Sequence, residues 1–158
     1  MSEISAENLA RLNGHYRSTV LIVAGQILMA LILGFVSVTG IVRNENPKTD
    51  TDFTSFWVAV LFVAVGSLLL RRLFFNWERL RNIALLRGIA GLLGNLRVNS
   101  LILSSMAEIV ALMGAVIAYL SGNAVDMIRA LAVSLVVFLV NFPRRNVWKK
   151  IVSNLEKV

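Results

Sequence analysis

The chain has 158 residues, of which 57% are hydrophobic, and its mean hydropathy is +0.74. Soluble domains are about 45–50% apolar, and the excess here lies in long uncharged runs, which indicates an integral membrane protein. Sixteen basic and nine acidic residues give a net charge of +7. Because the basic residues flank apolar runs, we assign them to membrane topology and lipid headgroups and expect no nucleic-acid partner.

The first half of the chain predicts two membrane spans. Residues 18–42 form an uncharged run of 25 residues, whereas a helix that crosses about 30 Å of hydrocarbon needs about 20. The polar connection RNENPKTDTD follows, and its Pro47 would stop a helix. The second span is residues 53–75, in which Arg71 and Arg72 would reach toward the interface.

The second half predicts two further spans. Residues 98–120 carry Glu108 and are followed by the polar sequence SGNAVD. Residues 127–143 form the shorter fourth span, with Pro143 at its exit. The fold class is therefore an all-α membrane protein with a single four-helix transmembrane domain over residues 1–158.

Residues 76–97, NWERLRNIALLRGIAGLLGNLR, connect the second and third spans. Their leucines and isoleucines recur near helical spacing, with arginines between them. Two interpretations remain open: an interfacial amphipathic helix, or helical extensions of the two spans with a turn within residues 88–95. We favour the second, because Gly88, Gly91 and Gly94 weaken a rigid helix.

The distribution of Lys and Arg predicts the orientation of the spans. Thirteen of the sixteen basic residues lie in three regions: the N-terminus, residues 76–97 with the preceding Arg71 and Arg72, and the C-terminal tail 144–158. The opposite side holds Arg43, Lys48 and Arg129. The positive-inside rule places the thirteen in the cytoplasm. Both termini are then cytoplasmic, which requires an even number of spans and agrees with four.

Several residues are expected at the membrane surface. Trp57, Trp77 and Trp148 fit the aromatic belts at the two interfaces. The C-terminal tail is expected to form a short surface helix, with apolar residues four apart. The expected contacts with membrane lipid or an acidic partner on the cytoplasmic side are made by Arg71, Arg72, Arg79, Arg81, Arg144 and Arg145.

Glu108 is the candidate functional residue. Ten residues separate it from Val98, which at about 1.5 Å per residue places it about 15 Å deep, near the middle of the membrane. An ionised carboxylate at that depth costs at least about 2.5–3.5 kcal/mol. No Lys or Arg lies at matching depth in the other predicted spans. The carboxyl should therefore be protonated, hydrogen-bonded, or next to a cation or water.

The neighbours of Glu108 supply candidate partners. Ser104 and Ser105 lie one turn before it, and Gln26 in the first span, at about 12 Å depth, is the best candidate to hydrogen-bond the neutral acid. A small-residue surface on the same helix favours close helix packing. Its members are Ala107, Ala111, Gly114, Ala115 and Ala118. A purely structural role for Glu108, as an interhelical hydrogen bonder that fixes packing, remains the alternative.

The sequence MAEIVALMGAVIA, residues 106–118, resembles the carboxylate-bearing helix of the rotary-ATPase proteolipids, the subunit c family. Ala107, Glu108, Ala111, Leu112 and Gly114 fall on matching positions of that family's pattern. The resemblance implies that Glu108 is a proton or sodium site and that the second and third spans form the proteolipid hairpin. The chain departs from the family in its extra span at each end and in having only Gly66 in the second apolar run.

Two functional hypotheses follow. The first is a proteolipid-like homo-oligomer whose Glu108 binds a proton or monovalent cation at the midplane. The second is an accessory or scaffolding subunit of a larger membrane complex, in which Glu108 is a buried structural hydrogen bonder. A pore is a weaker third hypothesis, because the polar residues of the other spans are few; they are Gln26, Ser37, Ser67, Ser134 and Asn141.

No catalytic constellation can be assembled from the sequence. It contains no phosphate-binding loop, HExxH, GxSxG or GxGxxG motif, no cysteine, and His15 as its one histidine. We therefore expect neither an enzyme nor a metal site, and no cofactor other than a proton or monovalent cation. The basic cytoplasmic side and the lack of cysteine fit an integral protein of a bacterial plasma (inner) membrane.

Overall fold

The computed structural model describes residues 4–41, 44 and 52–155, and in these residues it contains five helices and no strand. The helices are α1 (Ala6–Thr39), α2 (Thr54–Phe74), α3 (Trp77–Ser121), α4 (Ala124–Asn141) and α5 (Arg145–Leu155). Four stretches of helix are long and apolar enough to cross a membrane, which confirms the predicted number of spans. Arg43, Pro47, Lys48 and Lys157 lie outside the described residues.

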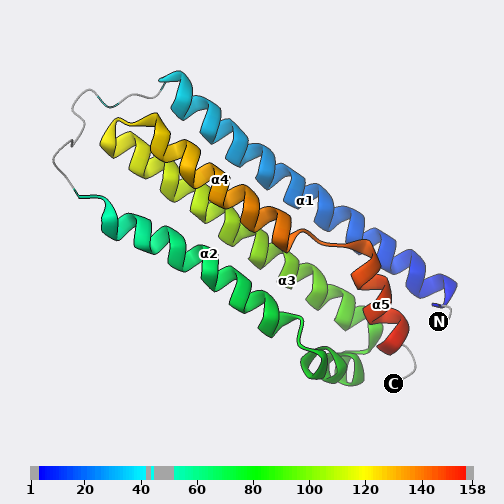
Figure 1. Cartoon of the computed structure of the whole chain (residues 1–158). Helices are drawn as coiled ribbons and strands as arrows, with labels where there is room; N and C mark the ends of the chain where they lie inside the picture. The colour runs from blue at the N-terminus through cyan, green and yellow to red at the C-terminus, as the bar shows by residue number, and fades with distance from the viewer. Residues whose placement is uncertain (1–3, 42–43, 45–51, 156–158) are drawn as a thin grey trace.

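The four long helices form a bundle in which α1 and α3 run in one direction and α2 and α4 in the other (Figure 1). The start of α1 and the whole of α5 lie at the same end of the bundle. The α3 helix is central, since it packs against each of the other four helices. We call the end that carries α5 the basic end, because Arg144, Arg145, Lys149 and Lys150 lie there.

The helices begin and end at residues suited to those positions. Ser5 caps α1 by accepting a hydrogen bond from the Asn8 backbone N–H, and Asn76 and Asn123 cap α3 and α4 in the same manner. Gly40 and Gly122 end α1 and α3 in the left-handed conformation that glycine adopts without strain. The first helix ends at Thr39, three residues before the predicted limit of the first span.

Side chains in the bundle are distributed as expected for a lipid-facing protein. Large apolar side chains cover the outside; Phe62 is 78% exposed and Leu21 is 73% exposed. Small and polar side chains fill the space between helices, including Ser67, Ser100, Ser104 and Ser134. Small residues let helices approach closely, and polar groups bond across the contacts, which is the packing pattern of membrane bundles.

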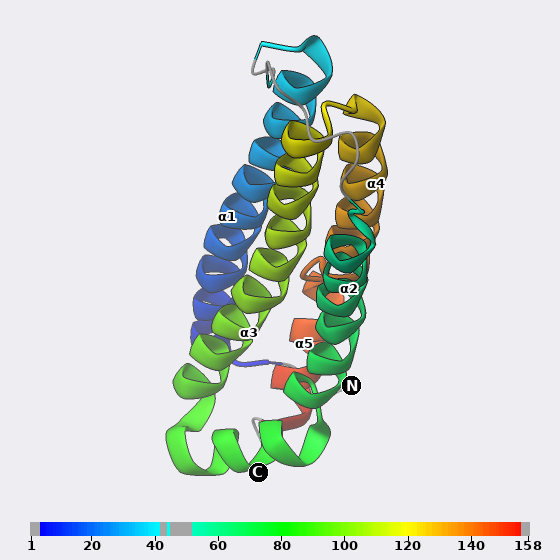
Figure 2. The same ribbon diagram turned by 90° about the vertical axis from the view of Figure 1, so that its left-hand side faces the viewer.

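The connection between the second and third spans is helical on both sides of one break. Gly88 has φ 65° and ψ −174°, a backbone conformation that is nearly exclusive to glycine. Residues 77–87 therefore form a short helix that crosses the basic end, and residues 89–121 turn away from it along the bundle (Figure 2). Gly91 is required at the same corner, because a Cβ there would lie 2.3 Å from Arg87 Cβ.

A second apolar core lies at the basic end, separate from the core between the spans. It joins α1, both parts of α3, and α5, and it comprises Leu12, Leu80, Leu92, Leu93, Leu96, Trp148, Ile151, Val152 and Leu155. Trp148 is only 1% exposed and its ring meets Tyr16 edge-on at 5.8 Å. The expectation that Trp148 belongs to an interfacial belt was wrong, because the tail helix docks on the bundle through it.

Candidate functional site

Glu108 lies within α3 at the border between its buried and outward faces. Ala107 and Ala111 on one side are fully buried, whereas Ile109 and Leu112 on the other are 44% and 46% exposed. Glu108 itself is half-buried. Within the described part of the chain, no hydrogen bond or ion pair reaches its carboxyl. The carboxyl is therefore available to something outside these residues.

Gln26 contacts Ser105 rather than Glu108. Its Nε2 donates to Ser105 Oγ over 3.1 Å, which ties α1 to α3 one turn before Glu108. Its Oε1 is buried and has no hydrogen-bond partner. Ser104 donates to the Leu101 carbonyl of its own helix at 3.0 Å. The predicted polar set thus divides into a Gln26–Ser105 pair, a self-satisfied Ser104, and an unpartnered Glu108.

The small residues of α3 lie at the contact with α4. Ala107, Ala111, Gly114 and Ala118 are buried, and Ala115 is half-buried. A Cβ on Gly114 would lie 2.1 Å from Ala130 Cβ, so the two backbones meet here. Ser134 Oγ in α4 donates to the Ala107 carbonyl over 2.7 Å and fixes the same contact. Glu108 lies at the edge of this surface, because it is one turn before Ala111 and next to the outward-facing Ile109.

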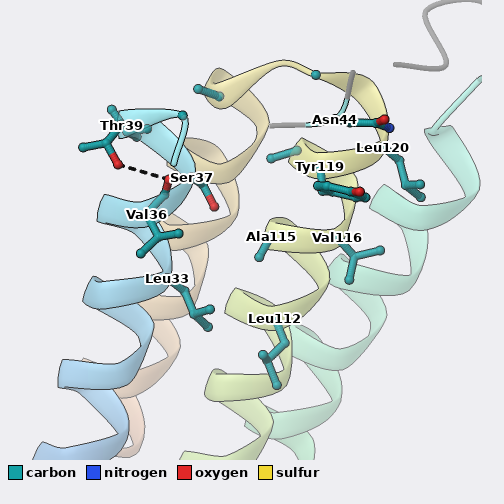
Figure 3. A pocket seen from close by; sticks show the side chains of 15 residues that line it. Leu33, Val36, Ser37, Thr39, Asn44, Leu112, Ala115, Val116, Tyr119 and Leu120 are labelled. Atoms are coloured by element: carbon teal, nitrogen blue, oxygen red, sulfur yellow. Dashed lines mark hydrogen bonds between the residues drawn. The ribbon is translucent and has the colours of Figure 1, made fainter. Parts of the chain in front are cut away.

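A groove of about 620 Å³ runs between α1 and α3, from near Glu108 to the end of the bundle opposite the basic end. Leu33 and Val36 line it from α1, and Leu112 and Ala115, one and two turns beyond Glu108, line it from α3 (Figure 3). Polar groups gather at its far end, where Ser37, Thr39 and Tyr119 lie. The groove is largely apolar, so it favours lipid or a helix over a column of water.

Of the few polar side chains that the other spans offer to a pore, all but Ser37 take part in hydrogen bonds between helices. Asn141 Nδ2 in α4 donates to Ser67 Oγ in α2 over 3.3 Å, and Ser67 Oγ donates to the Ala64 carbonyl over 2.7 Å. Asn99, which the sequence analysis did not single out, donates to Asn95 Oδ1 at 2.9 Å and to the Phe74 carbonyl at 3.4 Å. The i, i+4 spacing of the two asparagines was the signal that could have revealed it.

The residues predicted to make basic contacts gather at the basic end, on α2, on residues 77–87 and at the start of α5. Arg71 is half-buried, and the other five are exposed: Arg72, Arg79, Arg81, Arg144 and Arg145. Arg79 lies over the Phe74 ring at 5.0 Å, and Arg145 donates to Asn13 Oδ1 at 2.8 Å. None of the six forms an ion pair with another described residue. No described acidic residue therefore neutralises their charge.

Comparison of the chain with protein-family models, with curated proteins and with solved structures found no match.

Proposed function

We propose that the chain is a membrane-embedded subunit that assembles with further copies of itself, and that Glu108 of each copy binds a proton or a monovalent cation. The observation that carries this proposal is the half-exposed Glu108 carboxyl, which has no partner among the described residues. A carboxyl that only fixed the packing of this bundle would be expected to bond within it. Glu108 instead lies half-buried at the border of the outward face, where a proton, a cation or a neighbouring chain can reach it.

The energetics favour a bound proton or cation. An ionised carboxylate in hydrocarbon costs at least about 2.5–3.5 kcal/mol, and a proton or a cation removes that cost. The neutral acid has one O–H to donate. The unpaired Oε1 of Gln26, held one turn away by the bond to Ser105, is an acceptor in the same region. Movement of Glu108 between lipid and a polar neighbour would then couple its protonation to assembly.

The interior of the described bundle supports assembly. Ser67 and Ser134 are engaged in bonds along or between helices, and Asn141 Nδ2 donates to Ser67, so few polar groups remain to form a path through the described part of one copy. A path for an ion would have to form between copies or against another subunit. We place the basic end in the cytoplasm of a bacterial plasma membrane, on the basis of the positive-inside rule.

Infrared titration of the reconstituted protein tests this function. A protonated carboxyl has a carbonyl stretching band that an ionised one lacks. We expect this band in the wild type and in Glu78→Gln, a matched control at an exposed acid on residues 77–87, but not in Glu108→Gln. Added sodium should remove it. Identical wild-type and Glu108→Gln spectra from mildly acidic to mildly alkaline pH, with and without sodium, would overturn the proposal.

A second candidate function is an accessory subunit of a complex of unlike chains. The six arginines named above favour it, because none of them forms an ion pair with a described residue and an acidic protein surface could bind there. In this case Glu108 would bond to a polar group of the partner, and Glu108→Gln would preserve both assembly and activity. Subunits of a different sequence that co-purify at fixed stoichiometry would favour this candidate over the first.

A further inference from the structure

The seam between α2 and α4 holds an apolar groove of about 340 Å³ that is separate from Glu108. The two helices run in the same direction and lie beside each other (Figure 2). The groove is lined only by apolar side chains: Ala64, Val65, Leu68, Ala132, Val133, Val136, Val137 and Val140. Its wall is open to the outside, since Val65 is 54% and Val136 is 59% exposed. Its width and chemistry suit a hydrocarbon chain.

Arginines lie at the end of the same seam. Along α2, Leu68 lies four residues after Ala64, and Arg71 and Arg72 lie three and four residues after Leu68. The groove-lining face of α2 therefore continues into the arginine pair. On the α4 side, Arg144 lies three residues beyond the end of the helix at Asn141. Arg144 is close enough to Arg71 for the two positive charges to interact unfavourably. The Ser67–Asn141 hydrogen bond holds the ends of α2 and α4 together at this level.

This pair of like charges lacks a counterion within the described chain. Neither Arg71 nor Arg144 forms an ion pair with a described residue. Two guanidinium groups that approach each other without an anion repel, whereas a phosphate between them accepts hydrogen bonds from both. The site lies at the end of a predicted span, which is the depth at which phospholipid headgroups lie.

We propose that the α2–α4 seam binds one anionic phospholipid. An acyl chain lies in the groove from Leu68 toward Val133, and the phosphate is held by Arg71, Arg72 and Arg144. This lipid would fill the groove and neutralise the charge that the two helix ends bring together. The inference rests on the groove and the arginines, and not on Glu108, so it can stand or fall separately from the ion site.

The test is native mass spectrometry of the purified protein with phosphatidylglycerol and with phosphatidylcholine of the same acyl chains. We expect phosphatidylglycerol to be retained in preference. The double variant Arg71→Gln/Arg144→Gln should bind it roughly 10- to 30-fold more weakly, since each surface arginine contributes a several-fold effect. If the double variant does not fold, Arg144→Gln alone, a change at an exposed residue, should also weaken the binding of phosphatidylglycerol.

Two matched controls make the test specific. Arg87→Gln/Lys150→Gln removes the same charge from exposed residues of the same end and should change binding less than about threefold. Val136→Phe fills the groove and should weaken binding, whereas Leu139→Phe on the neighbouring face should not. Three results would each overturn the proposal: an equal loss of lipid binding in the two double variants, equal retention of the two lipids, or full binding by Val136→Phe. Full binding by Val136→Phe, together with binding of inorganic phosphate, would indicate a site for a free anion.

Discussion

At the scale of single residues, Gly114 decides how closely α3 and α4 approach. An added Cβ would meet Ala130 Cβ at 2.1 Å, so we expect Gly114→Ala to destabilise the bundle by about 1–3 kcal/mol. The next backbone atom, Ala130 Cα, lies at 3.5 Å, so the second change Ala130→Gly should recover most of the loss. Thermal unfolding in detergent measures both variants.

Gly25→Ala is the matched control for this prediction. It lies in α1, and a Cβ there would meet nothing within 4 Å. Its stability should equal that of the wild type or exceed it slightly, because alanine favours helix. If Gly114→Ala were as stable as Gly25→Ala, the close contact of α3 with α4 would be wrong.

Asp52 carries the second prediction at this scale. The hydroxyl and the backbone N–H of Thr54 donate to Asp52 Oδ1, and these bonds hold the pKa of the carboxyl below its ordinary value. Because the folded state favours the ionised form, the bonds contribute to the start of α2 at pH values above about 4 and are lost as the pH falls through the lowered pKa. The pH midpoint of the Asp52 carboxyl titration, measured by NMR, should therefore lie below that of an isolated aspartate.

Thr54→Val separates the two bonds, since it removes the hydroxyl and keeps the backbone N–H. The Asp52 midpoint should then rise part of the way toward that of an isolated aspartate. An unchanged midpoint in Thr54→Val would show that the hydroxyl does not hold the ionised form.

At the scale of elements, the corner between residues 77–87 and the rest of α3 depends on two glycines. Gly88→Ala would put an alanine at φ 65°, ψ −174°, at a cost of about 1–3 kcal/mol. Gly91→Ala would place Cβ 2.3 Å from Arg87 Cβ. Both variants should unfold at lower temperature and become more sensitive to protease near the corner.

Gly94→Ala is the control within the same segment. A Cβ there would meet nothing within 4 Å, so the change should be neutral or stabilising by up to about 1 kcal/mol. Equal losses at residues 88, 91 and 94 would mean that the chain does not turn at Gly88.

These elements also show what the sequence can and cannot predict. The four spans follow from long uncharged runs, and four helices of that kind are present. The position of the corner could not be chosen among Gly88, Gly91 and Gly94, because only the backbone reveals which one has a positive φ. The expected Gln26–Glu108 pair was not formed, since depth along two helices does not fix how they are rotated. In a span that is apolar all round, no amphipathic pattern supplies that rotation.

At the scale of the whole molecule, the basic end is a second packing unit built around Trp148. Trp148→Ala should cost about 3–5 kcal/mol and release α5, whereas the spans remain helical. Faster proteolysis at Lys149 and Lys150, with little change in helical circular dichroism, would report this. Val147→Ala, at a 42% exposed neighbour, should leave proteolysis unchanged. If it accelerated proteolysis equally, the docking of α5 through Trp148 would be wrong.

Only part of the packing at the basic end is predictable from the sequence. Apolar residues four apart predict an amphipathic tail helix, and Ile151 and Leu155 of that set are buried. The partner of that helix lies far away in sequence, at Leu12 and Leu92, and no local pattern specifies such a contact. Trp148 was therefore assigned to a lipid interface, which is the ordinary place for tryptophan at the end of a span.

The proposed function requires that identical copies of the bundle meet around Glu108. The mass and composition of the particle extracted from native membranes in mild detergent test this requirement. We expect several copies of this chain and no other protein, for the wild type and for Glu108→Gln alike. A single chain, or a fixed complex with unlike subunits, would contradict the proposed assembly.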